Sequence, residues 1–271
     1  MDKRPIGVFD SGLGGLSTVR AMKKILPNED IVYFGDTGRV PYGSRSNETI
    51  ETYAAQDIKF LQSFSCKMIV AACGTVSTVA ADIMDKIDEP STGITKPSAK
   101  AAAYATTNNI IGVMGTSATV KSKAFEEEIC KTNPDAKVVS VACPMLVSLV
   151  ENNWIDIDDE VANAAVKRYL KPIIEAGADT IILGCTHFPI LAPIIQKIAG
   201  GYVKLIDTGF EEAMFVKDVL RKNGIENDSE HIGTQKFFVS DKPQNFCEVA
   251  NILLGEDIES KCEFIDIFKH I

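Results

Sequence analysis

The chain alternates short apolar runs with longer segments in which apolar residues recur at helical spacing. The short runs predict buried strands at residues 5–9, 31–34 and 68–72. The longer segments predict helices at 16–26, from about 47 to 63, and from 76 to 84. Strands that alternate with helices are typical of right-handed crossovers, so we expect an α/β fold with a mainly parallel, doubly wound sheet.

A second series of the same kind begins near residue 110. It predicts strands at 110–114, 138–142 and 180–183, with a long helix from about 158 to 176. Residues 6–9 are similar to residues 111–114, and the strand that ends at Cys73 is similar to the strand that ends at Cys185. We therefore expect one duplicated unit, with a cysteine at the same structural place in each half.

The remainder of the chain, from about residue 207, predicts a helix near 211–222 and a strand at 236–240. We expect this tail to pack back onto the first lobe and complete its sheet. The first lobe then consists of residues 1–97 plus 207–271, and the second of residues 98–206. Residues 90–97 have the character of a linker.

Composition limits the classes of protein that fit these elements. A chain of 271 residues, 45% hydrophobic and 24% charged, matches a soluble globular protein of two ordinary lobes. The net charge of -9, without a dense Lys/Arg stripe, argues against a nucleic-acid partner. The start of the chain does not read as a signal peptide and no stretch is long enough to span a bilayer, so we expect a cytoplasmic protein with no membrane partner.

The seven cysteines are an odd number in a chain without a signal peptide, which favours reduced thiols over a disulfide framework. No two of them form a CxxC motif and the three histidines are scattered, so we expect no metal site. Five of the cysteines are interpreted as packing or surface thiols: Cys66, Cys130, Cys143, Cys247 and Cys262. The remaining two, Cys73 and Cys185, end matched strands and are the candidates for chemistry.

Polar residues gather where the predicted strands end, which is where open α/β sheets bind ligands. They include Asp10, Ser11, Cys73, Gly74, Thr75, residues 116–119, Cys143, Cys185, Thr186 and His187, with Glu151 a little further on. Hydroxyl groups and free helix N–H groups suit a carboxylate, so the expected ligand is small, polar and anionic. The segment that contains Pro41, Tyr42 and Gly43 reads as a tight loop, or as a wall that presents amides to that ligand.

The positions of Cys73 and Cys185 suggest a specific reaction. Each lies between a buried strand and a helix N-terminus, a setting that lowers the pKa of a thiol below its free value of about 8.5. A single cysteine at a strand end is also explained by packing, because cysteine is common in cores. A matched pair of cysteines that face each other across a cleft predicts a reaction that one cysteine alone does not. One thiol removes a proton from a carbon centre and the other returns one to the opposite face, which is racemisation.

Three further residues have both a chemical and a structural interpretation. His187 is either an acid–base partner of Cys185 or a satisfied buried histidine. Asp10 is either a proton-transfer helper or the cap of an ordinary strand-to-helix turn. Glu151 is either part of the site or a solvated helix end. The run from Gly12 to Gly15 is not GxGxxG, so the sequence gives little support to a dinucleotide cofactor.

Six segments together resemble the glutamate racemase family in order and spacing: GVFDSGLGGLSTVRAM, YFGDTGRVPYG, VAACGTVST, GVMGTSATV, CPMLVSLVE and ILGCTHFPIL. The resemblance implies two pseudo-symmetric flavodoxin-like lobes with the active site between them. It implies glutamate as the small-molecule substrate, no pyridoxal phosphate or other cofactor, and no metal. It also implies a role in supplying D-glutamate for peptidoglycan, and so for the cell wall and cell shape. Members of the family often form dimers, which makes a homodimer one expected assembly.

The resemblance also assigns residues. It implies Cys73 and Cys185 as the two catalytic thiols, helped by Asp10 and His187 respectively, with Glu151 supporting the second. The implied substrate-binding positions are Asp10, Ser11, Pro41, Tyr42, Gly43, Gly74, Thr75, Thr186 and His187. One position departs from the family pattern, because many members have an asparagine after the first catalytic cysteine and this chain has Gly74.

Gly74 lacks the side-chain amide of that asparagine, which keeps a second substrate open. The nearest alternative is therefore an aspartate racemase or a broader racemase of acidic amino acids. An alternative of another class is a two-lobed module that binds acidic amino acids without chemistry. A Cys-His hydrolase would need only one cysteine and gives no reason for the second.

Overall fold

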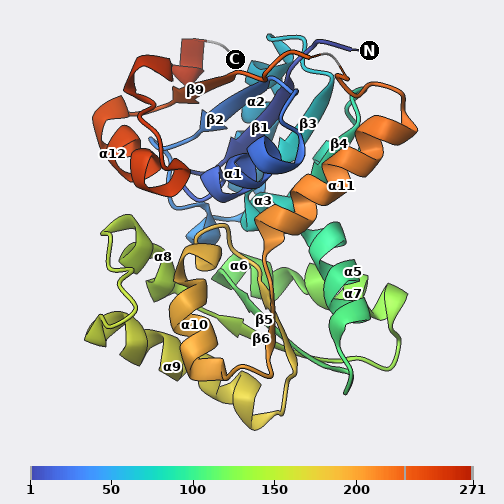
Figure 1. Ribbon diagram of the computed structural model, residues 1–271, viewed down its shortest axis with the longest axis vertical. Helices are drawn as coiled ribbons and strands as arrows, with labels where there is room; N and C mark the ends of the chain where they lie inside the picture. The colour runs from blue at the N-terminus through green and yellow to red at the C-terminus, as the bar shows by residue number, and fades with distance from the viewer. Residues whose placement is uncertain (1, 229, 270–271) are drawn as a thin grey trace.

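The computed structural model describes residues 2–228 and 230–269. The strands are β1 (Ile6–Asp10), β2 (Ile31–Gly35), β3 (Met68–Ala71), β4 (Ser91–Gly93), β5 (Ile110–Gly115), β6 (Lys137–Ala142), β7 (Thr180–Leu183), β8 (Lys204–Ile206), β9 (Gln235–Val239) and β10 (Cys262–Phe264). They form two sheets, in the orders β10-β9-β2-β1-β3-β4 and β6-β5-β7-β8 (Figure 1). Every strand pair given by the structure is parallel, which confirms the predicted α/β class.

Helices surround both sheets. They are α1 (Leu16–Ile25), α2 (Asn47–Gln62), α3 (Gly74–Val79), α4 (Ala81–Met84), α5 (Thr95–Ala105), α6 (Ser117–Ser122), α7 (Ala124–Thr132), α8 (Pro144–Glu151), α9 (Glu160–Glu175), α10 (Ala192–Ala199), α11 (Thr208–Lys222) and α12 (Pro243–Leu254). Short 3-10 turns occur at η1 (Tyr42–Ser44), η2 (Phe188–Leu191), η3 (Glu259–Lys261) and η4 (Ile267–Lys269). Side-chain caps begin several helices, because Ser46, Asp159 and Asp207 each accept a hydrogen bond from a backbone N–H of the first turn.

The two sheets share one internal order. In the first sheet the strands β2-β1-β3-β4 lie side by side, and in the second β6-β5-β7-β8 repeat that order one for one. The similar segments 6–9 and 111–114 occupy β1 and β5, at equivalent places. Cys73 follows β3 and Cys185 follows β7. The predicted duplication therefore has a structural counterpart, and each half carries its cysteine after the same strand.

Alternation along the buried strands sorts their side chains onto two faces of each sheet. In β1, Ile6 and Val8 join the apolar cluster that contains residues of α1, α11 and α12. Phe9 points to the other face and joins the cluster that contains residues of α2 and α3. Figure 1 shows the first sheet between these helices, with the second lobe below it. Both sheets are thus covered on both faces, as parallel sheets require.

The chain passes from the first sheet to the second after β4 and returns after β8. Helices α5 and α11, which begin just after these two passages, contact each other. The tail then adds β9 and β10 to the edge of the first sheet beside β2, as the sequence predicted. The lobe boundaries at residues 97 and 207 stay a prediction.

Two sequence predictions of local structure were wrong. Residues 90–97 are not a linker, because Ser91–Gly93 form β4 and pair with β3, and α5 begins at Thr95. The helix expected from 76 to 84 is broken into α3 and α4 at Ala80. Hydroxyl groups explain the break: Ser77 donates to the Cys73 carbonyl and Thr78 to that of Gly74, bonds that favour a short turn over a long helix.

Candidate active site

A pocket of about 250 Å³ lies between the two lobes, at the carboxyl ends of β1, β3, β5 and β7. Eleven of the predicted site residues line it: Ser11, Pro41, Tyr42, Gly43, Cys73, Gly74, Thr75, Glu151, Cys185, Thr186 and His187. The two candidate thiols therefore reach the same pocket, one from each sheet. Among the residues that the family resemblance implies for the site, Asp10 alone does not line the pocket.

Cys73 lies at the start of α3 and is 4% exposed. Its Sγ donates to Ser11 Oγ at 3.6 Å. Burial, together with the negative charge of Asp10, raises the pKa of the Cys73 thiol to about 12. The sequence prediction of a lowered pKa was therefore wrong for this residue. Helix α3 has only six residues, and its N-terminal amides and Ser11 offset the burial only in part.

The second thiol has a different set of neighbours. Cys185 Sγ lies 3.7 Å from Nδ1 of His187, and Nε2 of the same ring lies 3.4 Å from Oε1 of Glu151. Burial alone lowers the pKa of the His187 imidazole, but its contacts with Cys185 and Glu151 outweigh burial and raise that pKa to about 10. These contacts therefore favour the protonated form of the His187 imidazole. It lies between a thiol and a carboxylate, a chain of groups through which a proton can pass.

Asp10 is fully buried behind the pocket wall. Its Oδ2 accepts a hydrogen bond from the Gly12 N–H at 2.9 Å, which closes the strand-to-helix turn. Its Oδ1 accepts from Thr186 Oγ1 at 3.3 Å, across the boundary between the lobes. Asp10 therefore caps the turn, as one of its two sequence interpretations expected. It also lies beside both thiol-bearing segments, and its role in proton transfer stays a prediction.

The wall formed by Tyr42 is held by a buried ionic network. The Tyr42 hydroxyl contacts Asp36 and donates to Asp57 Oδ2 at 3.0 Å. Arg39 donates to Asp36 Oδ2 at 2.6 Å and to Asp57 Oδ1 at 2.8 Å. Burial and the charge of Asp57 raise the pKa of Tyr42 well above its usual value. Tyr42 therefore turns its hydroxyl away from a ligand, and this wall offers its ring and the backbone of Gly43.

Close contacts between the lobes surround the pocket. A Cβ added at Gly74 would lie 2.5 Å from the carbonyl oxygen of Gly184, the residue before Cys185. Thr75 and Thr116 share a hydrogen bond of 3.0 Å between their hydroxyl oxygens. Gly74 is thus where the two cysteine-bearing segments touch, and no side chain fits there without movement.

The sequence assigned no role to seven residues of the pocket lining: Val40, Ser44, Thr116, Ser117, Pro144, Val147 and Ser148. The hydroxyl run that begins at Thr116 was visible at the end of a predicted strand, but no role was assigned to it. Pro144, Val147 and Ser148 follow Cys143 on α8, and no local signal distinguishes them from a helix face that packs on the core. Cys143 itself is buried and does not line the pocket.

The described part of the chain contains no candidate metal site and no candidate membrane-spanning helix. Within residues 2–228 and 230–269, no group of three or more His, Cys, Asp or Glu side chains is placed to hold a metal ion. Among the same residues, no helix is both long enough and apolar enough to cross a bilayer.

Two similar lobes that each bring a cysteine to one shared pocket define a narrow class of protein, and comparison with known proteins identifies it. The chain belongs to the Asp/Glu/Hydantoin racemase family, whose model matches residues 6–230. It is 41% identical over 256 residues to the glutamate racemase of Geobacter metallireducens, which covers 94% of each chain.

Solved structures agree with this assignment. The glutamate racemase of Bacillus anthracis is similar with a TM-score of 0.93 at 34% identity, covering 98% of each chain. The glutamate racemase of Francisella tularensis, solved in complex with D-glutamate, is similar with a TM-score of 0.91 at 35% identity, covering 99% of this chain and 100% of the other. The family resemblance found in the sequence motifs is confirmed.

Proposed function

We propose that this protein interconverts L- and D-glutamate by a two-thiol 1,1-proton transfer that needs no cofactor. One observation carries the proposal: Cys73 and Cys185 reach one pocket from equivalent strand ends of two similar sheets. The glutamate racemases to which the chain is similar over nearly its whole length support glutamate as the substrate.

The proposed reaction balances within the pocket. One cysteine, as thiolate, takes the proton from Cα, and the other, as thiol, gives its proton to the opposite face of the same carbon. The Cα proton of an amino acid is far less acidic than a thiol, so the intermediate needs strong stabilisation. Hydroxyl groups of Ser11, Thr75 and Thr186 line the pocket and can meet the negative charge on the substrate carboxylates.

The two thiols receive different help. The Cys73 thiol, with its pKa of about 12, is held in the protonated form beside Ser11, with Asp10 nearby as the group that takes up or returns its proton. At Cys185, the His187–Glu151 pair supplies the corresponding proton relay. Asp10, His187 and Glu151 are therefore proposed as proton-transfer helpers, and the remaining lining residues as substrate contacts.

The decisive experiment is proton NMR of D- and L-glutamate in D₂O with the enzyme. We expect loss of the Cα–H signal together with inversion of configuration. Cys73→Ala and Cys185→Ala should each abolish racemisation, whereas Cys130→Ala, at an exposed cysteine, is the matched control and should retain it. Full racemase activity in either pocket variant would refute the two-thiol scheme. Absence of deuterium incorporation from every acidic amino acid would favour the binding module.

Gly74 favours a second candidate within the same class, a racemase of aspartate or of several acidic amino acids. Gly74 has no side chain, so the pocket lacks the amide contact that the resemblance implies for many members of the family. Comparing kcat/KM for both enantiomers of glutamate and aspartate decides between the two. A higher value for aspartate would overturn glutamate as the substrate and leave the mechanism intact.

The proposed physiological role is the supply of D-glutamate for peptidoglycan in the cytoplasm. It rests on the similarity to glutamate racemases and on a fold with no helix able to span a membrane among the described residues. Growth of a D-glutamate-requiring bacterium on expression of this chain tests it. No growth, despite racemase activity in the lysate, would refute the role while leaving the activity standing.

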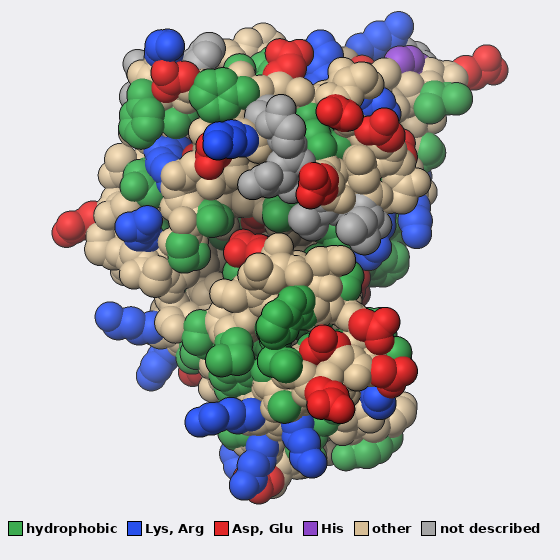
Figure 2. Space-filling view, turned by 90° about the vertical axis from the view of Figure 1, so that its left-hand side faces the viewer, with side chains coloured by type: hydrophobic (Ala, Val, Ile, Leu, Met, Phe, Trp, Pro, Cys, Tyr) green, Lys and Arg blue, Asp and Glu red, His purple; other side chains and the backbone are tan. Residues whose placement is uncertain are grey.

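A homodimer is the proposed assembly. Figure 2 shows apolar side chains gathered on the second lobe, on the side where α8 and α9 lie. Met145, Trp154, Ile157 and Val161 belong to this region and are 44–53% exposed. Because α8 also carries Glu151, contact there would touch the wall of the site. Sedimentation should give a dimer that Trp154→Glu converts to a monomer, and a monomeric wild-type protein would refute the proposal.

A further inference from the structure

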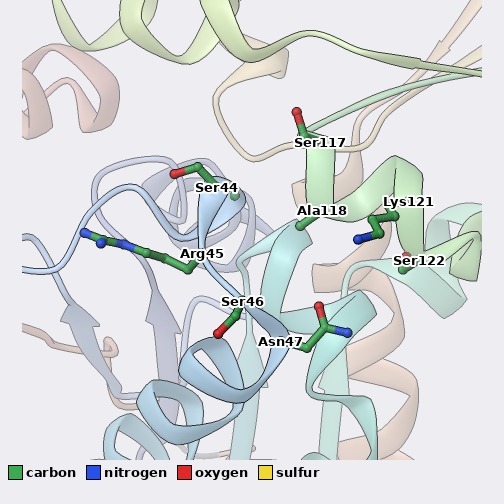
Figure 3. Close-up of a pocket in the computed structure, with 9 residues that line it drawn as sticks. Ser44, Arg45, Ser46, Asn47, Ser117, Ala118, Lys121 and Ser122 are labelled. Atoms are coloured by element: carbon green, nitrogen blue, oxygen red, sulfur yellow. The ribbon is translucent and has the colours of Figure 1, made fainter.

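A second cavity lies beside the substrate pocket and is the larger of the two. Its volume is about 460 Å³, against about 250 Å³ for the pocket, and the two share Gly43, Ser44 and Ser117. Residues 43–47 of the first lobe form one wall and residues of α6 in the second lobe form the other (Figure 3). The cavity therefore continues the pocket along the boundary between the lobes.

The lining of this cavity carries positive charge and no carboxylate. Its charged residues are Arg45 and Lys121, and its other polar side chains are Ser44, Ser46, Asn47, Ser117 and Ser122. In Figure 3 the Lys121 ammonium points into the space between the two walls, whereas Arg45 extends away from that space. Across residues 2–228 and 230–269, the salt bridges include neither of these two cations.

An ammonium group flanked by hydroxyl and amide groups is suited to an oxyanion. Lysine offers three N–H donors, serine hydroxyls and the asparagine amide add more, and hydrogen bonds to an ionised acceptor are the strong ones. The chain as a whole has a net charge of -9, which repels anions from most of its surface. A cavity whose charged residues are both cations is therefore a local exception, and its field favours an anion there.

We propose that this cavity is an oxyanion-binding vestibule, with Lys121 as its main ligand. The group it takes is a carboxylate of an acidic amino acid on its way into the pocket, or the phosphate of a soluble ligand. The carboxylate source rests on the proposed racemase function, whereas the anion site itself does not. Lys121 is exposed and lies outside the pocket lining, so its role is capture and positioning rather than proton transfer.

The first arm of the test titrates inorganic phosphate and follows the backbone amide signals of residues 44–47 and 117–122 by NMR. We expect saturable shifts that Lys121→Gln weakens about two- to fivefold, the loss expected for one partly exposed charged contact. Lys100→Gln, which removes an exposed lysine of α5 outside this cavity, is the matched control and should bind phosphate as the wild type does. This arm needs no enzymatic activity, so it decides on the site even if the racemase proposal fails.

The second arm separates the two sources of the anion by kinetics. If a substrate carboxylate uses the vestibule, Lys121→Gln raises KM for glutamate about two- to fivefold with kcat unchanged, and it flattens the fall of kcat/KM with salt. If phosphate binding is lost in this variant while KM and the salt dependence stay as in Lys100→Gln, the ligand is a phosphate compound. Phosphate shifts that are absent, or equal in both variants, overturn the vestibule whatever the kinetics show.

Discussion

Replacing Gly74 by alanine adds a single methyl group where the two lobes touch. The new Cβ would lie 2.5 Å from the Gly184 carbonyl oxygen, about half an ångström inside the 3.0 Å limit that real Cβ contacts respect. That oxygen is backbone, so the contact is relieved only by moving the segment of Cys73, the segment of Cys185, or both. Alanine therefore changes the spacing of the two thiols without removing any group that takes part in the reaction.

The magnitude follows from how sharply proton transfer depends on position. A misplacement of about 1 Å costs on the order of 100-fold in rate, so half that shift should cost at least about tenfold. We expect kcat/KM of Gly74→Ala to fall about 10- to 100-fold in both directions, or roughly 1.4 to 2.7 kcal/mol of transition-state stabilisation. Stability should change little, because alanine favours the first turn of α3 and offsets part of the steric cost.

The assay is the racemisation rate from each enantiomer, with urea unfolding measured in parallel. Gly201→Ala is the matched control, because a Cβ there meets nothing within 4 Å. Wild-type kcat/KM in Gly74→Ala would refute the reasoning, since it would mean that the lobes are free to separate at no cost. An equal loss in Gly201→Ala would show that the effect is not specific to the contact between the lobes.

Three further predictions concern buried ionisable side chains. The folded-state pKa of His187 is raised to about 10, so its contribution to stability is complete below its unfolded value of about 6.5 and is lost as pH rises through 10. Urea unfolding of His187→Gln against wild type should show a difference at pH 6 that vanishes near pH 10, and a constant difference would contradict this. Burial raises the pKa of Glu212 well above its usual value, so the native state holds a proton there and loses stability as pH rises above about 4.3. Glu212→Gln should therefore unfold at higher urea than wild type at pH 8, and a lower midpoint would show the carboxylate to be needed. Lys67 Nζ lies 2.5 Å from Oε2 of the buried Glu29, so Lys67→Met should cost about 3 to 5 kcal/mol in urea unfolding. The double variant with Glu29→Gln should recover most of that loss, and no recovery would assign the cost to packing.

The sequence was sufficient for the parts of the fold that local periodicity controls. Buried strands such as 31–34 and 180–183, and long amphipathic helices such as 158–176, were predicted within a few residues. The misses were short elements held by tertiary contacts. β4 has three residues and exists because β3 pairs with it, which its own sequence does not reveal. β8 and β10 are equally short and were not predicted.

In the candidate site, too, some features were predictable from the sequence and others depend on tertiary contacts. Residues at strand ends, such as Cys73 and Cys185, were predictable because the ends of parallel strands meet at one edge of a sheet. The pKa of Cys73 was not, because it depends on burial and on Asp10, which are known only once the chain is folded. The direction of the Tyr42 hydroxyl was not predictable either, because its hydrogen-bond partner Asp57 lies on α2, well apart in the sequence.

The unequal surroundings of the two thiols have a thermodynamic consequence. Enantiomers have the same free energy in water, so the equilibrium constant of a racemase is one. Both directions pass through the same transition states from reactants of equal free energy, so kcat/KM is equal for D- and L-substrate. The difference between the Ser11 side and the His187 side can thus appear only as paired changes in kcat and KM. Any substitution at one thiol's helpers must slow both directions by the same factor in kcat/KM.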